Sequence, residues 1–251
     1  MKKATAFLIA ILMVLALSAC SKDLETTPSA SENGTNSLNE HPSSGNSDNS
    51  DDTINNKETE SENDTIESKI LIAYFSYGEN ADLPNNVDAS ASASIQLLNG
   101  EITGNTGLVA NYIQKATGGN LFSIHTTEKY SPDYNTVVDQ GQAEKNNNVK
   151  PKIATHLENL DSYDIVFIGF PNWWYGMPMV MYSFFDEYDF SGKTIIPFCT
   201  SGGSAFSDAI SEIKEAEPNA TVLDGLHISG SRAASAESSV GEWISGLDIL
   251  K

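Results

Sequence analysis

Residues 165–176, with the sequence IVFIGFPNWWYG, join an apolar run to a cluster of aromatic side chains. The apolar run, residues 165–170, is short, continuous and rich in β-branched residues, which is typical of a strand buried on both faces of a parallel sheet. Open α/β sheets bind ligands beyond the carboxyl ends of their strands. The sequence therefore predicts that residues 171–176 present flat aromatic faces to a ligand at this edge.

Four further apolar segments predict the other strands of the same sheet. They lie at residues 69–75, 121–125 and 194–200, and in a fifth strand, whole or broken, at 221–223 and 226–228. Between them, helical patterns cover residues 106–117, 134–147, 179–185, 205–215 and 236–247. This alternation predicts an α/β fold with a doubly wound, five-stranded parallel sheet and helices on both faces. Pro197 lacks the N–H that a central strand needs, so a bulge or a shift in pairing is expected there.

The first twenty residues have the features of an export signal. Lys2 and Lys3 precede an apolar stretch, residues 7–17, that is too short to span a bilayer. The sequence LSAC at residues 17–20 resembles the lipobox of bacterial lipoproteins, which implies cleavage before Cys20 and attachment of lipid to it. The alternative is an ordinary secretory signal with a chance cysteine. If Cys20 carries lipid, only Cys199 remains and no intrachain disulfide can form.

Residues 21–67 are rich in Ser, Thr, Asn, Asp and Glu and poor in large apolar side chains. Such a segment cannot bury enough surface to offset its ordering entropy, so we expect a disordered tether. The predicted organisation is a lipoprotein signal at 1–20, the tether at 21–67 and one domain at 68–251. The domain would be held outside the bacterial cell membrane by lipid alone.

The chain is strongly acidic, with a formal net charge of −20 at pH 7. It offers no basic patch for nucleic acid, so we expect no nucleic-acid partner. The acidic surface is either a solvated face that keeps the protein soluble or, in addition, a surface that steers a basic partner.

Hydroxyl-bearing residues surround the predicted start of the first long helix. Ser76 follows the first strand, and Thr103, Gly104, Asn105 and Thr106 open the helix; we call these five residues loop one. Hydroxyls and free backbone N–H groups at a helix N-terminus can cradle a phosphate monoester, because the helix dipole favours an anion there. The alternative is that Gly-Asn-Thr only caps the helix.

Loop one resembles the phosphate loop of the flavodoxin family, whose S/T-x-T-G-x-T pattern binds the 5′-phosphate of FMN. Residues 75–76 match its start and residues 103–106 its end, while residues 78–102 are inserted between them. This split is typical of a bacterial flavodoxin-like subfamily. The resemblance implies the flavodoxin-like strand order 2-1-3-4-5 and FMN as the cofactor.

The same resemblance assigns two more loops to the cofactor. In flavodoxin-like folds the loop after the third strand lies along the isoalloxazine ring, and loop two (residues 171–176) contains the Pro-x-Trp-Trp form of it. Its predicted contacts are Pro171, Asn172, Trp173, Trp174, Tyr175 and Gly176. The alternative is that both indoles belong to the core, but adjacent residues leaving a strand point in opposite directions, so at least one should face solvent or ligand.

Loop three, residues 200–204, directly follows the fourth strand. Thr200, Ser201, Gly202 and Gly203 could supply donors and close backbone approach to the pyrimidine edge of a flavin, or could form a plain turn. Cys199 is interpreted as a small buried hydrophobe rather than a nucleophile. The histidines His125, His156 and His227 show no metal-ligand spacing and are interpreted as structural or surface residues.

These observations predict a lipid-anchored, FMN-binding redox protein that transfers electrons with an unidentified partner or small-molecule substrate. No residue is assigned a catalytic role. Two alternatives remain: an NAD(P)H-dependent quinone or small-molecule reductase, and a binding module that keeps the fold without the flavin.

Overall fold

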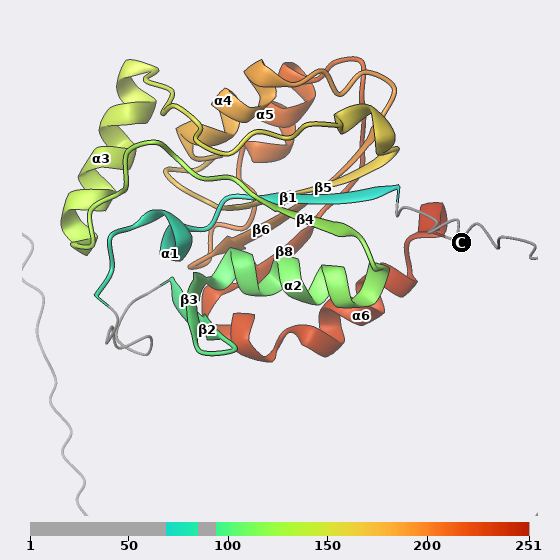
Figure 1. Cartoon of the computed structure of the whole chain (residues 1–251), viewed down its shortest axis with the longest axis horizontal. Helices are drawn as coiled ribbons and strands as arrows, with labels where there is room; N and C mark the ends of the chain where they lie inside the picture. Colours follow the sequence, from blue (N-terminus) through green and yellow to red (C-terminus); the bar gives the residue numbers. More distant parts are fainter. Residues whose placement is uncertain (1–68, 85–93, 251) are drawn as a thin grey trace, which may run out of the picture. The chain divides into compact units, whose positions relative to one another are not determined.

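Five parallel strand positions form one twisted sheet between two layers of helices (Figure 1). The computed structural model describes residues 69–84 and 94–250, so the predictions for residues 1–68, including Cys20 and the tether, lie outside the described residues. The described residues all belong to one compact unit, Ser61–Lys251. None of its described helices is long and apolar enough to cross a membrane.

The sheet has the predicted order. Its strands are β1 (Ile70–Tyr74), β4 (Asn120–Ser123), β5 (Ile165–Pro171), β6 (Thr194–Ser201), β7 (Thr221–Val222) and β8 (Leu226–Ser229). They are arranged as β4-β1-β5-β6-β7, with β8 also beside β6, and every pairing is parallel. The predicted fold class and the order 2-1-3-4-5 are therefore confirmed, because β7 and β8 together form the fifth position.

Apolar side chains alternate across β5 and build a core on each face of the sheet. Val166, Ile168 and Phe170 join the cluster beneath α3 (Tyr134–Asn147), α4 (Met179–Glu187) and α5 (Ala209–Ala216). Phe167 joins the opposite cluster, beneath α2 (Asn105–Thr117) and α6 (Glu237–Ser245). Figure 1 shows these two helical layers on either side of the sheet. A strand covered on both sides reads as a continuous apolar run, as predicted.

Pro197 interrupts pairing on one side of β6 only. The register with β5 runs unbroken through the pair Ile168–Pro197. On the other side, β7 pairs with Thr194 and Ile195, and β8 begins its pairing at Phe198. The fifth strand is thus broken beside the residue that lacks an N–H, which is the predicted shift in pairing.

The described parts of the segment at 78–102 contain regular secondary structure. They include part of the short helix α1 (Tyr77–Asn80) and an antiparallel hairpin of β2 (Ile95–Leu98) and β3 (Glu101–Gly104). Thr103 and Gly104, expected in a loop, therefore close a strand, and the helix begins at Asn105.

The helix predicted from residue 205 begins only at Ala209. Ala205 and Ser207 have φ angles of +50° and +46°, and a right-handed helix cannot include residues in that region. Short 3₁₀ turns complete the fold at η1 (Leu160–Ser162), η2 (Gly230–Ser235) and η3 (Asp248–Leu250).

Candidate functional site

A cavity of about 440 Å³ lies at the C-terminal edge of the sheet, and all three predicted loops contribute to it. Its volume is within the range of small-molecule sites, roughly 300–1,000 Å³. The predicted residues that line it are Asn105, Pro171, Asn172, Trp173, Trp174, Thr200, Ser201 and Gly202. None of the described residues that line it carries a charged side chain.

The other predicted residues lie around this lining rather than in it. They are Ser76, Thr103, Gly104 and Thr106 in loop one, Tyr175 and Gly176 in loop two, and Gly203 in loop three. Tyr175 projects outward, with 67% of its surface exposed, whereas Ser76 is fully buried.

Seven lining residues were not predicted. They are Tyr77, Ser94, Tyr134, Val137, Val138, Gly230 and Ser231. Two signals could have identified most of them. Residues 134, 137 and 138 share one face of α3 through their i, i+3, i+4 spacing, and residues 230–231 directly follow the fifth strand.

The residues that follow β1 and the residues that precede α2 are in close contact at two glycines. A Cβ atom on Gly78 would lie 2.0 Å from the Thr103 carbonyl oxygen, and one on Gly104 would lie 2.5 Å from Ser76 Oγ. The β2–β3 hairpin returns the chain to the end of β1, and Asn105 N donates a hydrogen bond to Ser94 O at 3.0 Å. Segments separated by residues 78–102 therefore form one continuous surface at the start of α2.

The Ser76 hydroxyl is buried at this surface without a hydrogen-bond partner among the described residues. The neighbouring Thr103 hydroxyl is instead satisfied by the Glu79 carboxylate, which also accepts from Tyr74. A buried polar group left unpaired costs about 1–3 kcal/mol. An unsatisfied hydroxyl beside a helix N-terminus that has no side-chain cap fits a ligand with acceptor oxygens.

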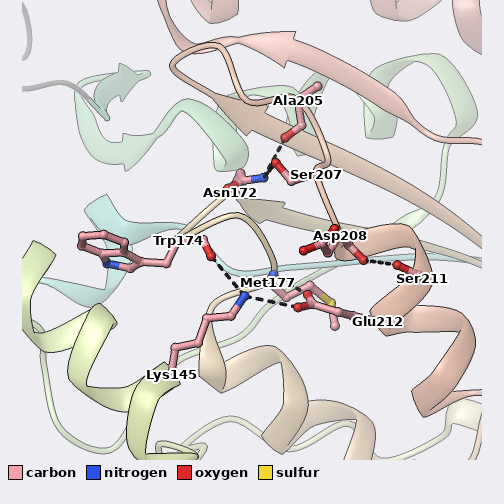
Figure 2. Close-up of polar contacts among 9 residues, drawn as sticks. All are labelled: Lys145, Asn172, Trp174, Met177, Ala205, Ser207, Asp208, Ser211 and Glu212. Carbon is pink, nitrogen blue, oxygen red and sulfur yellow. Dashed lines mark hydrogen bonds and ion pairs between the residues drawn. The ribbon is translucent and has the colours of Figure 1, made fainter.

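Hydrogen bonds join the three loops to one another. Thr106 Oγ1 and Thr200 Oγ1 are 2.8 Å apart, which links loop one to loop three. Asn172 N donates to Thr200 O at 2.8 Å, and its side-chain Nδ2 donates to Ala205 O at 2.9 Å (Figure 2). The three strand ends therefore act as one rim.

The two adjacent indoles have different surroundings. The Trp173 ring packs edge-on against Phe75 and Tyr130, with centroids 5.6 and 5.2 Å apart. Trp174 is 36% exposed as a residue, and its Nε1 donates to Val138 O at 3.0 Å. The expectation that at least one indole faces solvent or ligand is confirmed for Trp174, and the alternative that both are core is wrong.

Loop two contains a tight turn with an unfavourable backbone. Trp173 and Gly176 exchange both backbone hydrogen bonds, N to O, at 3.0 and 3.2 Å. Between them, Trp174 and Tyr175 have φ angles of +52° and +66°, the left-handed pattern of a type I′ turn. Each side chain in this region costs on the order of 1 kcal/mol, so contacts elsewhere must hold the turn.

His227 organises loop three. Ser201 Oγ accepts hydrogen bonds from Gly203 N and Ala205 N and lies 2.8 Å from His227 Nε2. Burial, helped by the positive charge of Arg232, lowers the pKa of His227 below its usual value. A neutral imidazole can accept a hydrogen bond from the Ser201 hydroxyl, which agrees with the interpretation of His227 as a structural or surface residue.

Cys199 is buried behind loop three, and burial raises the pKa of its thiol to about 12. A thiol that stays protonated at neutral pH is a poor nucleophile. Within residues 69–84 and 94–250, no group of three His, Cys, Asp or Glu side chains could hold a metal ion.

Comparison with known proteins identifies a family that the chain matches. A family model described as Flavodoxin matches residues 95–247. Flavodoxin 1 of Shigella flexneri is 27% identical over 148 residues, which cover 53% of this chain and 70% of that protein. The crystal structure of a Bacteroides eggerthii protein assigned as a flavoprotein superposes with a TM-score of 0.54 at 28% identity, covering 71% of this chain and 97% of that one. A similar structure from Bacteroides uniformis has a TM-score of 0.54 at 27% identity, covering 71% and 99%.

Proposed function

The chain belongs to the flavodoxin family, and we propose that its cavity holds FMN, the cofactor of that family, and that the protein transfers electrons through it. The observation that carries the proposal is the convergence of loops one, two and three on one uncharged cavity at the carboxyl ends of β1, β5 and β6. This is where open α/β sheets bind their ligands.

The start of α2 is suited to the phosphate of FMN. The Ser76 hydroxyl supplies an unused donor, and the first N–H groups of the helix bring the positive end of its dipole. Thr106 instead supports the site through its hydrogen bond to Thr200. No lysine is required for such a site, because hydroxyl groups, backbone N–H groups and the helix dipole together stabilise the anion.

Loops two and three would hold the flat ring. Trp174 offers an exposed aromatic face at the cavity, and Asn172 fixes loop two against loop three. Gly202 lines the cavity, and the space beside its Cα is open, since a Cβ atom there would meet nothing within 4 Å. Without a side chain, its backbone can come close to a bound ring. FMN supplies the redox chemistry when bound, while the protein orients the ring and excludes water.

Replacing Ser76 by alanine tests the phosphate assignment. Titration of the Ser61–Lys251 unit with FMN should quench flavin fluorescence at one equivalent, and Ser76→Ala should weaken FMN binding roughly 10-fold, as loss of a hydrogen bond to a charged group implies. Riboflavin, which lacks the phosphate, serves as the matched ligand, and its affinity should not change in this variant.

The FMN titration tests for the binding module without flavin, and a turnover assay tests for the reductase. A colourless protein that ignores FMN would favour the binding module without flavin. Steady oxidation of NADH in the presence of a soluble quinone would favour the reductase over an electron carrier.

We further propose that lipid on Cys20 anchors the protein outside the bacterial cell membrane. The support is the sequence alone: the lysine-led apolar stretch and the LSAC tetrapeptide at residues 17–20. In cells fed an alkyne-tagged fatty acid, the wild-type protein should carry the label and Cys20→Ser should not. A labelled serine variant would contradict the assignment.

A further inference from the structure

An ion pair outside the cavity is hydrogen-bonded to the backbone at both ends of the strained turn of loop two (Figure 2). Lys145 on α3 and Glu212 on α5 are joined at 3.2 Å between Nζ and Oε1. The same Nζ donates to the Trp174 carbonyl oxygen at 3.1 Å. One lysine thus connects α5 to the first left-handed residue of the turn.

Glu212 holds the other side of the turn. Its second carboxylate oxygen accepts a hydrogen bond from Met177 N at 2.9 Å, directly after the turn ends. Burial and, after it, the negative charge of Glu212 raise the pKa of the nearby Tyr182 hydroxyl. The two charged side chains are only 31% and 18% exposed, so solvent screens them less than an open surface pair.

The ion pair occupies the space that a side chain at position 176 would fill. A Cβ atom at that position would lie 2.5 Å from Glu212 Oε2 and 2.5 Å from Lys145 Nζ. The pair therefore packs directly on the peptide of the turn. The preceding peptide is held as well, because Asp208 N, at the start of α5, donates to Tyr175 O at 3.2 Å.

Both the backbone and the side chain of Trp174 are hydrogen-bonded to α3. Its backbone carbonyl is bonded to Lys145, while its indole N–H reaches Val138 on the same helix. We propose that Lys145 and Glu212 are positioning residues, which keep the turn in its left-handed conformation and so hold the Trp174 indole at the cavity. The effect on the cofactor rests on the proposed function, whereas the effect on the indole does not.

The test measures the indole itself, without FMN. With 5-fluorotryptophan incorporated, the protein should give one ¹⁹F resonance for each of its three tryptophans, assigned with Trp174→Phe. Glu212→Gln and Lys145→Met should each shift or broaden the Trp174 signal. The Trp243 signal should stay unchanged, because that ring packs on Phe167 at the opposite face of the sheet. Glu215→Gln, on the same helix but exposed, is the matched control and should resemble wild type.

A second measurement links the pair to the cofactor. FMN affinity should fall about 10-fold in Glu212→Gln and in Lys145→Met, with less quenching of flavin fluorescence, as expected for a hydrogen-bonded charge lost from a positioning contact. An unchanged Trp174 resonance in both variants would overturn the proposal. Equal changes at Trp243 would do so too, because the pair would then support the whole fold. If wild type failed to bind FMN, only the proposed function would fall, since the ¹⁹F result stands alone.

Discussion

Alanine at position 78 should cost the protein about 3 kcal/mol or more in free energy of unfolding, at the upper end of what overpacking costs. The added Cβ would lie 2.0 Å from the Thr103 carbonyl oxygen and 2.5 Å from its carbon, and both atoms belong to backbone. A side chain can rotate away from such a clash, but a backbone can relieve it only by moving β3 or α1. Urea unfolding of the apoprotein, followed by circular dichroism, measures the loss.

Gly241→Ala provides the matched control for this substitution. Gly241 lies within α6, and a Cβ atom there would meet nothing within 4 Å. Alanine should stabilise this helix by about 0.5–1 kcal/mol, because glycine is the poorer helix former. If Gly78→Ala unfolded at the same urea concentration as wild type, the close backbone contact between Gly78 and Thr103 would not exist in solution.

Both halves of loop one were predicted from the sequence, whereas the β2–β3 hairpin between them was missed. The sequence nevertheless contains a signal for this hairpin. Asn99-Gly100 is the dipeptide of a type I′ turn, and it separates short runs that contain Ile95, Leu97 and Ile102. The structure bears this out with φ angles of +53° and +87° at the two turn residues. Because residues 78–102 are mainly polar, the two short strands were not recognised on either side of the turn dipeptide.

The late start of α5 had no comparable signal. Alanine is the best helix former, yet Ala205 lies outside the helix with a positive φ. Its N–H donates to Ser201 Oγ of loop three, and its carbonyl accepts from Asn172 Nδ2 of loop two. The contact with Asn172 is tertiary, so local propensity could not predict this boundary. The strands were predictable because burial on both faces makes their apolar runs continuous.

The sequence could not show which indole packs against the core and which is more exposed, because Trp173 and Trp174 are identical neighbours. Their ring contacts separate them. Trp173→Ala removes a ring that packs on Phe75 and Tyr130 and should destabilise the apoprotein by about 3 kcal/mol. Trp173→Phe is the conservative companion, and it should recover part of this loss by refilling the aromatic cluster.

Trp174→Ala should have the reverse signature, with an apoprotein stability within about 1 kcal/mol of wild type and FMN binding weakened roughly 10-fold or more. Trp174 is 36% exposed and lies outside both core clusters, whereas a flat cofactor in the cavity would cover its ring. Trp174→Gly controls for the backbone, because glycine relaxes the φ of +52° that alanine keeps strained. Equal losses of FMN affinity in the two variants would assign the effect to the ring. If both Trp174→Ala and Trp173→Ala held FMN as tightly as wild type, loop two would not be part of the flavin site.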